Sequence, residues 1–115
     1  MRNYLLMREK IHSYLGFAKK SGNLVSGYDA CICGIQQKKI AFMILTADLS
    51  ENTRKKMQKA VECDNVLFRT YGTIEKMQEM TGEVNKGIYG IKDPNLGMAI
   101  MNEIDRCALN GKKEE

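Results

Sequence analysis

The continuous apolar run Ile40–Leu45 constrains the fold of this chain more than any other stretch of its sequence. It contains no polar residue and is ended by Thr46-Ala47-Asp48. A strand with one face in water would alternate apolar and polar residues, whereas an unbroken apolar run is typical of a strand covered on both faces. We therefore predict a central strand here, with other elements packed above and below it.

Helical and strand patterns alternate along the 115 residues. Apolar residues at helical spacing predict helices at about 5–20 and 28–37, after Asp48 or Ser50, between Thr73 and Gly82, and after Asp93-Pro94. Short apolar segments predict further strands at 24–25, 66–71 and 88–91. The alternation predicts a single α/β domain over residues 1–115, a three-layer α/β/α sandwich with a four-stranded mixed sheet. Residues 1–9 are expected to extend the first helix and residues 110–115 to form a frayed tail.

Several helix ends carry recognisable local signals. Asp48 or Ser50 is expected to cap the third helix, and Glu51, three residues after Asp48, fits a capping box. Tyr28 is expected on the core side of the second helix and Cys33 on its outer side. Three other ends are marked by a cap, a glycine or a proline: Thr73 and Gly82 at the start and end of the fourth helix, and Asp93-Pro94 at the start of the last.

Hydropathy bears on where the protein resides. No run is apolar enough to span a membrane. The opening residues 1–8 are too short and too charged for a signal peptide. These features predict a cytoplasmic protein that does not contact membranes.

The residue types that bind metals or carry catalysis are scattered along the sequence. Cys31 and Cys33 lie two apart in a predicted helix and so point to nearly opposite faces, while Cys63, Cys107 and His12 have no neighbour at ligand spacing. We expect reduced thiols, no metal and no cofactor. Glycine-rich nucleotide motifs and Ser-His or Cys-His pairings are not recognisable either, so we expect no enzyme.

Basic residues gather in two parts of the chain, which carries a net charge of +4. Five basic residues oppose only Glu9 within residues 1–20, and the predicted third helix has a basic outer face. This face consists of Arg54, Lys55, Lys56 and Lys59. Such a distribution suits a polyanionic partner, although a charged face can also be merely solvated.

The small-residue segment Ser21–Ala30 leads into the second helix. Gly22 and Gly27 bracket a brief apolar pair, which predicts a turn, a short strand and a second turn. Gly27 then stands ahead of the unpaired backbone N–H groups of a new helix, where phosphate or the acceptor edges of bases could bind. The alternative is an ordinary connection whose glycines only satisfy backbone geometry.

Three sequence motifs resemble one known family. Residues 15–27 (LGFAKKSGNLVSG), residues 44–56 (ILTADLSENTRKK) and residues 71–73 (YGT) are similar to the small bacterial relatives of the L-seven-Ae/L-thirty-e ribosomal-protein family. The resemblance covers about residues 10–100, and the run in 44–56 is fairly specific. It implies an α/β/α sandwich that binds kink-turns, which are sharply bent internal RNA loops with tandem sheared G·A pairs.

The resemblance also implies where RNA would bind. The family's RNA face combines the loop at the start of the second helix, the start of the third helix and the loop before the last strand. Carried over to this chain, the implied contacts are Ser26, Gly27, Tyr28, Asp29, Ser50, Asn52, Thr53, Arg54, Lys55, Val84, Asn85 and Lys86. Backbone N–H groups would read the G·A edges, basic residues would hold phosphate, and an aliphatic residue would support an extruded base.

The chain departs from the family pattern at its base-reading positions. The family's Asn-Glu pair falls on Asp29-Ala30, and its lysine falls on Cys33. Ala30 cannot accept a hydrogen bond from guanine, Cys33 cannot neutralise phosphate, and Asp29 brings a negative charge. The general RNA-facing surface is retained while the base-reading centre is altered.

Two functional readings follow from these motifs. The first is a monomeric, non-catalytic protein that binds structured RNA, in ribosomal RNA or an mRNA leader, as a ribosome-associated or regulatory protein. The second is a protein-interaction module on the same fold, with Val84 as an apolar anchor. RNA binding predicts affinity that falls steeply with salt, whereas a protein interface predicts weaker salt dependence.

Overall fold

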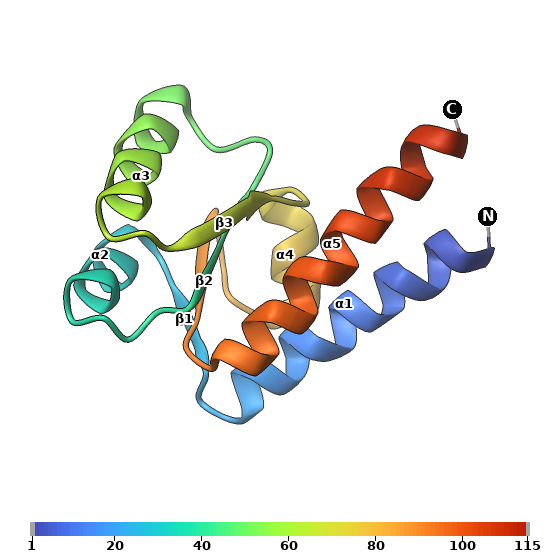
Figure 1. Ribbon diagram of the computed structural model, residues 1–115, viewed down its shortest axis with the longest axis horizontal. Coiled ribbons are helices and arrows are strands. Elements are labelled where there is room, and N and C mark those ends of the chain that lie inside the picture. The colour runs from blue at the N-terminus through green and yellow to red at the C-terminus, as the bar shows by residue number, and fades with distance from the viewer. Residues whose placement is uncertain (1, 115) are drawn as a thin grey trace.

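The computed structural model describes the backbone of residues 2–114 and the side chains of residues 10–108. Helices and strands alternate along the chain (Figure 1). Their bounds are α1 Arg2–Lys20, β1 Leu24–Ser26, α2 Tyr28–Gln36, β2 Phe42–Leu45, α3 Glu51–Cys63, β3 Leu67–Thr70, α4 Ile74–Thr81, β4 Ile88–Ile91 and α5 Pro94–Glu114. α1 starts before the expected position near residue 5, and α5 includes residues 110–114. The predicted fraying of residues 110–115 stays a prediction, because their side chains lie outside the described part. The side chain of Met7, which the helical spacing places on the apolar stripe of α1, also lies outside it.

The strands form one four-stranded mixed sheet in the order β1-β4-β2-β3. β4 runs antiparallel to both β1 and β2, and β3 runs parallel to β2. In this register Ser26 pairs with Tyr89, while Leu45 pairs with Ile88 and with Thr70. The last residues of β1, β2 and β3 and the first residue of β4 therefore meet at one end of the sheet.

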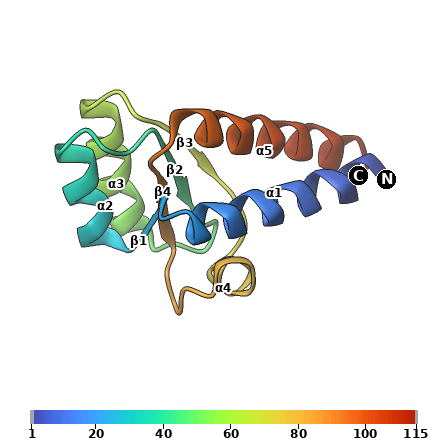
Figure 2. The same cartoon turned by 90° about the horizontal axis from the view of Figure 1, so that it is seen from below.

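Helices cover both faces of the sheet, which confirms the α/β/α sandwich (Figure 2). Along β2, Phe42 and Ile44 point into the cluster formed with α1, α4 and α5, while Met43 and Leu45 point into the cluster formed with α2 and α3. All four side chains are buried, as expected for alternating directions on a doubly covered strand. The predicted central strand is therefore confirmed.

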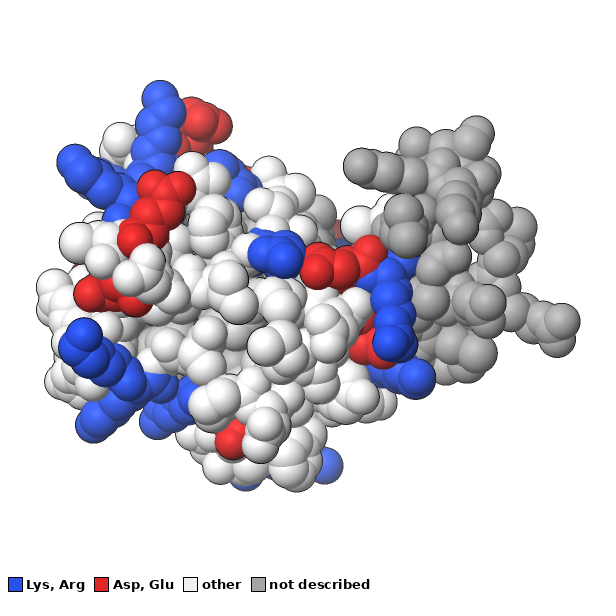
Figure 3. All heavy atoms as spheres, viewed as in Figure 1, with Lys and Arg blue, Asp and Glu red and all other residues white. Residues whose placement is uncertain are grey.

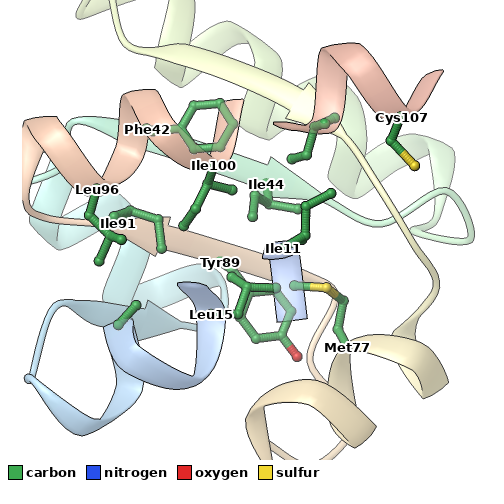
Figure 4. Packing of buried hydrophobic residues seen from close by; sticks show 12 residues of the cluster. Ile11, Leu15, Phe42, Ile44, Met77, Tyr89, Ile91, Leu96, Ile100 and Cys107 are labelled. Carbon is green, nitrogen blue, oxygen red and sulfur yellow. The ribbon is translucent and has the colours of Figure 1, made fainter. Parts of the chain in front are cut away.

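The larger core cluster lies under the long pair of helices α1 and α5. Figure 4 shows side chains of α1, α4 and α5 meeting those of β2 and β4, with Tyr89 among the largest buried groups. Ile11, Leu15 and Ala18 carry the inner stripe of α1, and all are fully buried. This stripe agrees with the helical spacing in the sequence. His12 lies off the stripe and is exposed, also as predicted.

Most of the predicted helix ends are confirmed. Thr73 Oγ1 accepts from the Lys76 N–H at 3.1 Å, and Asp93 Oδ2 accepts from the Leu96 N–H at 2.8 Å. Gly82 ends α4 in the left-handed conformation, with φ of 78°. These signals depend on residues three or four positions apart, so local sequence is enough to identify them.

Of the two residues expected to cap α3, Ser50 is confirmed, because its Oγ accepts from the Thr53 N–H at 3.3 Å. The alternative, a capping box of Asp48 with Glu51, is wrong. The Asp48 carboxylate instead accepts from the backbone N–H of Ile74, in the first turn of α4, at 3.0 Å. The chain between β2 and α3 passes beside the start of α4, so a tertiary contact replaces the local one.

Tyr28 also differs from its expected position on the core side of α2. Its side chain is 38% exposed, whereas Cys31 and Ile35 of the same helix are buried. α2 begins beyond the end of β1, so its first turn extends past the sheet. Cys33 is exposed, as predicted from helical geometry.

The thiols of the described residues range from buried to exposed. Cys31 donates to the Val25 carbonyl oxygen at 3.7 Å, and burial raises the pKa of its thiol to about 12. It therefore remains protonated at neutral pH and is a poor nucleophile. Across the described part of the chain, no helix combines the length and apolar character that membrane spanning requires.

Candidate nucleic-acid interface

The three segments singled out in the sequence meet at one end of the sheet. The Gly27 N–H donates to the Ile88 carbonyl oxygen at 2.9 Å, which joins the start of α2 to the start of β4. The Thr46 N–H donates to the Gly87 carbonyl oxygen at 3.0 Å, which joins the end of β2 to the same loop. Segments far apart in the sequence are thus joined at this end of the sheet.

Gly27 occupies a backbone conformation that requires glycine. Its φ of 94° and ψ of 157° lie in a region that is strongly unfavourable for residues with a side chain. A Cβ at this position would lie 3.3 Å from Lys86 Nζ, so the lysine side chain crosses directly over the turn. Gly27, the N-cap of α2, has no side chain, and among the described side chains none caps the first N–H groups of this helix.

The loop between α4 and β4, residues 82–87, presents an apolar tip. The Asn85 N–H donates to Gln78 Oε1 at 3.2 Å, and Asn85 itself has a positive φ of 55°. Asparagine tolerates this conformation better than most residues. Val84 is 69% exposed at the tip, and Lys86 is exposed beside it. The loop therefore exposes an aliphatic group and a cation two positions apart.

At the start of α3, three predicted contact residues already have partners within the chain: Ser50, Thr53 and Arg54. Ser50 Oγ is occupied in the helix cap and donates to Thr53 Oγ1 at 2.9 Å. Arg54 donates to the Thr46 carbonyl oxygen and, at 3.1 Å, to Thr70 Oγ1. Arg54 therefore links the ends of β2 and β3, and these two bonds use two of the five N–H donors of its guanidinium. Asn52 and Lys55 are exposed on the same turn.

The charge of the surrounding surface is mixed. Figure 3 shows Lys and Arg side chains over α3 and beside α2, with acidic side chains among them. Lys55, Lys56 and Lys59 of α3 are exposed, which confirms the basic outer face of this helix. Asp29, Ala30 and Cys33 are exposed on α2, so the departures from the family pattern lie on the surface.

A hollow beside the 82–87 loop has acidic walls. It is lined by Asp48, Ile74, Glu75, Gln78, Glu79 and Asn85. Its carboxylates would repel a phosphate, so it marks the limit of the surface that suits RNA. Within the residues that the structure describes, no group of three His, Cys, Asp or Glu side chains is arranged to hold a metal ion.

The structure adds two residues to the candidate site that are not among the predicted contacts, Glu83 and Lys19. Glu83 Oε1 accepts from Ser26 Oγ at 2.7 Å, and Glu83 Oε2 pairs with Lys19 Nζ at 2.9 Å. Ser26 and Glu83 are separated by 57 positions in the sequence. The sequence around either residue does not predict this contact, because it depends on the pairing of β1 with β4.

Comparison with known proteins gives three informative similarities. No protein-family model matches the sequence. The RNA-binding protein YlxQ of Enterococcus faecium is 30% identical over 87 residues, which cover 75% of this chain and 82% of that protein.

Two solved structures share the fold. One is a protein of unknown function from Bacillus halodurans, with a TM-score of 0.80, 22% identity and coverage of 84% of this chain and 97% of that one. The other is the 15.5kD RNA-binding protein of Giardia lamblia, with a TM-score of 0.70, 12% identity and coverage of 90% and 88%. Both similarities extend over most of the α/β/α sandwich.

Proposed function

The chain belongs to the family of the RNA-binding protein YlxQ, the L-seven-Ae/L-thirty-e family, and we propose on this basis that it binds structured RNA without catalysing a reaction. The observation that supports this proposal most strongly is the convergence of three separate segments at one end of the sheet. Gly27, Thr46 and Ile88 are joined there by backbone hydrogen bonds. A single RNA internal loop could contact all three segments at once.

Each segment has a distinct role in this proposal. The start of α2 offers backbone N–H groups to the acceptor edges of bases. Lys86, held over Gly27, neutralises a phosphate, and Lys55 at the start of α3 neutralises another. Val84 packs against a base that leaves the stack, as apolar groups do in single-stranded RNA recognition. Because Asp29, Ala30 and Cys33 replace more suitable groups, backbone and phosphate contacts carry most of the affinity.

The proposed target is a kink-turn or a related internal loop in ribosomal RNA or an mRNA leader. Internal loops of this kind present unstacked bases, which suits a surface that exposes an aliphatic side chain, Val84, and the cations Lys86 and Lys55. We propose that the protein acts as a monomer, in the cytoplasm, as a ribosome-associated or regulatory factor.

The decisive experiment is a titration of the protein with two RNAs at two salt concentrations. One RNA contains a kink-turn, and in the control its G·A pairs are replaced by Watson–Crick pairs. We expect tighter, salt-sensitive binding to the kink-turn RNA. Equal weak binding to both would refute kink-turn recognition, and absence of binding to either would refute RNA binding.

Lys86→Ala tests the phosphate contact. We expect weaker binding to the kink-turn RNA and a salt slope that is smaller by about 1, because one fewer counterion is released. Lys92→Ala is the matched control, since Lys92 is equally exposed but follows the opposite end of β4. An unchanged slope in Lys86→Ala, or an equal change in Lys92→Ala, would remove Lys86 from the interface.

A protein-interaction module remains the second candidate function. The observation that favours it is the exposed apolar tip at Val84, next to an acidic hollow that does not suit phosphate. An interface of this kind would depend on buried apolar area and would tolerate salt. Failure to bind either RNA, together with salt-insensitive binding of a protein partner that Val84→Asp abolishes, would favour this function.

A further inference from the structure

An acidic side chain is fixed inside the surface that we propose meets RNA. The Glu83 carboxylate bridges the end of α1 and the end of β1, through Lys19 at 2.9 Å and Ser26 at 2.7 Å. Lys19 Nζ lies close to the loop backbone as well, since a Cβ on Gly82 would come within 3.2 Å of it. One carboxylate therefore joins the 82–87 loop to two consecutive elements, α1 and β1, that lie far from it in the sequence.

The carboxylate is ionised at neutral pH. Hydrogen bonds from Lys19 and Ser26 lower the pKa of Glu83, and the positive charges of Lys19 and Lys86 lower it further. A negative charge beside Lys86 weakens the local attraction for phosphate. The negative charge of Glu83 therefore disfavours RNA binding at this surface, so attraction for RNA does not explain a carboxylate at this position.

The 82–87 loop is anchored through its backbone at both ends. The Glu83 N–H donates to Thr81 Oγ1 at 3.1 Å and the Asn85 N–H donates to Gln78 Oε1, which ties the loop back to α4. At the other end, the Gly87 carbonyl oxygen accepts from the Thr46 N–H at 3.0 Å, which ties the loop to the end of β2. Among the side-chain hydrogen bonds and ion pairs of residues 82–87 in the described structure, only those of Glu83 reach across to α1 and β1.

We propose that Glu83 is a positioning residue of the interface, whose carboxylate fastens the 82–87 loop to Lys19 and Ser26 and so holds Lys86 over Gly27, and Val84 in its exposed position, before RNA binds. This inference rests on the proposed function. A loop that is already in its bound position loses less conformational freedom on binding, and the observed affinity rises with the fraction of molecules in the competent state.

The variant Glu83→Gln distinguishes a purely electrostatic role of Glu83 from a positioning role, because the two roles predict opposite changes in affinity for the kink-turn RNA. The amide keeps the size of the side chain but loses the ion pair and removes a negative charge. If Glu83 acts only through its charge, the variant binds RNA more tightly. If Glu83 positions the loop, the variant binds about fivefold more weakly, as expected when the competent fraction falls by that factor.

Glu79→Gln is the matched control, because Glu79 is an exposed carboxylate of α4 that lines the hollow next to the loop. It should bind RNA as tightly as the unaltered protein or more tightly. A double-mutant cycle with Lys19→Gln adds a second criterion. We expect the Lys19 substitution to have a smaller effect when Glu83 is already replaced, whereas independent charges would act additively.

A readout without RNA tests the loop directly. Backbone ¹⁵N relaxation of residues 83–87 in the free protein should show lower order parameters in Glu83→Gln, while the unfolding midpoint stays close to that of the unaltered protein. Equal or tighter RNA binding, unchanged order parameters, or a weakened affinity that merely follows a lowered unfolding midpoint would each overturn the inference. If the unaltered protein bound no RNA, the proposed function would fail, and the relaxation data would still decide whether Glu83 orders the loop.

Discussion

Gly27→Ala is expected to destabilise the protein by about 1–3 kcal/mol and to weaken RNA binding by about tenfold or more. The conformation of Gly27, with φ of 94°, is one that a residue with a Cβ adopts only under strain. The new methyl group would also lie 3.3 Å from Lys86 Nζ. The lysine end can move aside at little cost, but it then leaves its place over the turn. Chemical unfolding and RNA titration of the same preparation measure the two effects.

Gly22→Ala is the matched control for this prediction. Gly22 stands at the other end of β1 with a φ of 76°, and a Cβ there would meet nothing within 4 Å. Strain should therefore cost a comparable amount of stability, about 1–2 kcal/mol, with RNA affinity unchanged. Retention of full RNA affinity by a folded Gly27→Ala protein would show that the turn is not part of the interface.

Phe42→Ala is expected to lower the free energy of unfolding by about 3–5 kcal/mol, the range for removing a buried aromatic side chain. Phe42 is 2% exposed on the central strand, in the cluster that includes Leu96 and Ile100 of α5 (Figure 4). Gly97 of α5 approaches so closely that a Cβ there would lie 2.9 Å from Phe42 Cβ. Because domains of this kind are stable by only about 5–15 kcal/mol, the loss is a large share of the total.

Leu67→Ala serves as the comparison for Phe42→Ala. Leu67 pairs with Phe42 across the parallel strands β2 and β3, but it is 50% exposed at the edge of the sheet. Its truncation should cost less than about 1.5 kcal/mol, because much of the side chain is already in water. Urea unfolding with equal slopes for the variants would report stability alone. Similar costs for the two substitutions would contradict the placement of β2 at the centre of the core.

Local signals were enough to predict most of the fold. The apolar run ending at Leu45 predicts a doubly covered strand, and Thr73, Gly82 and Asp93 mark helix ends through contacts with residues close in sequence. The capping box predicted for Asp48 was wrong because a contact distant in the sequence replaces it. Its carboxylate has two possible backbone partners, one local and one in α4, and only the packing of α4 beside this turn selects between them.

Some residues of the candidate site could also be predicted from local sequence. Glycine at position 27, the polar start of α3 and the Val84–Lys86 loop stand out in the sequence, and the structure brings them to one end of the sheet. Whether they contact RNA stays a prediction. The engagement of Arg54 with Thr46 and Thr70 was not predictable, because it depends on β3 lying beside β2.

The order of helices and strands, the doubly covered central strand and the turns that require glycine could be predicted from the sequence, because each depends on residues within a few positions of one another. Which loops meet follows only from the way the strands pair and the helices pack on them. In the strand order β1-β4-β2-β3, the last strand of the chain lies between the first two, and this brings Glu83 to Ser26 and Lys86 to Gly27. The free energy of such contacts comes from groups distant in the chain, so no local pattern of residues encodes them.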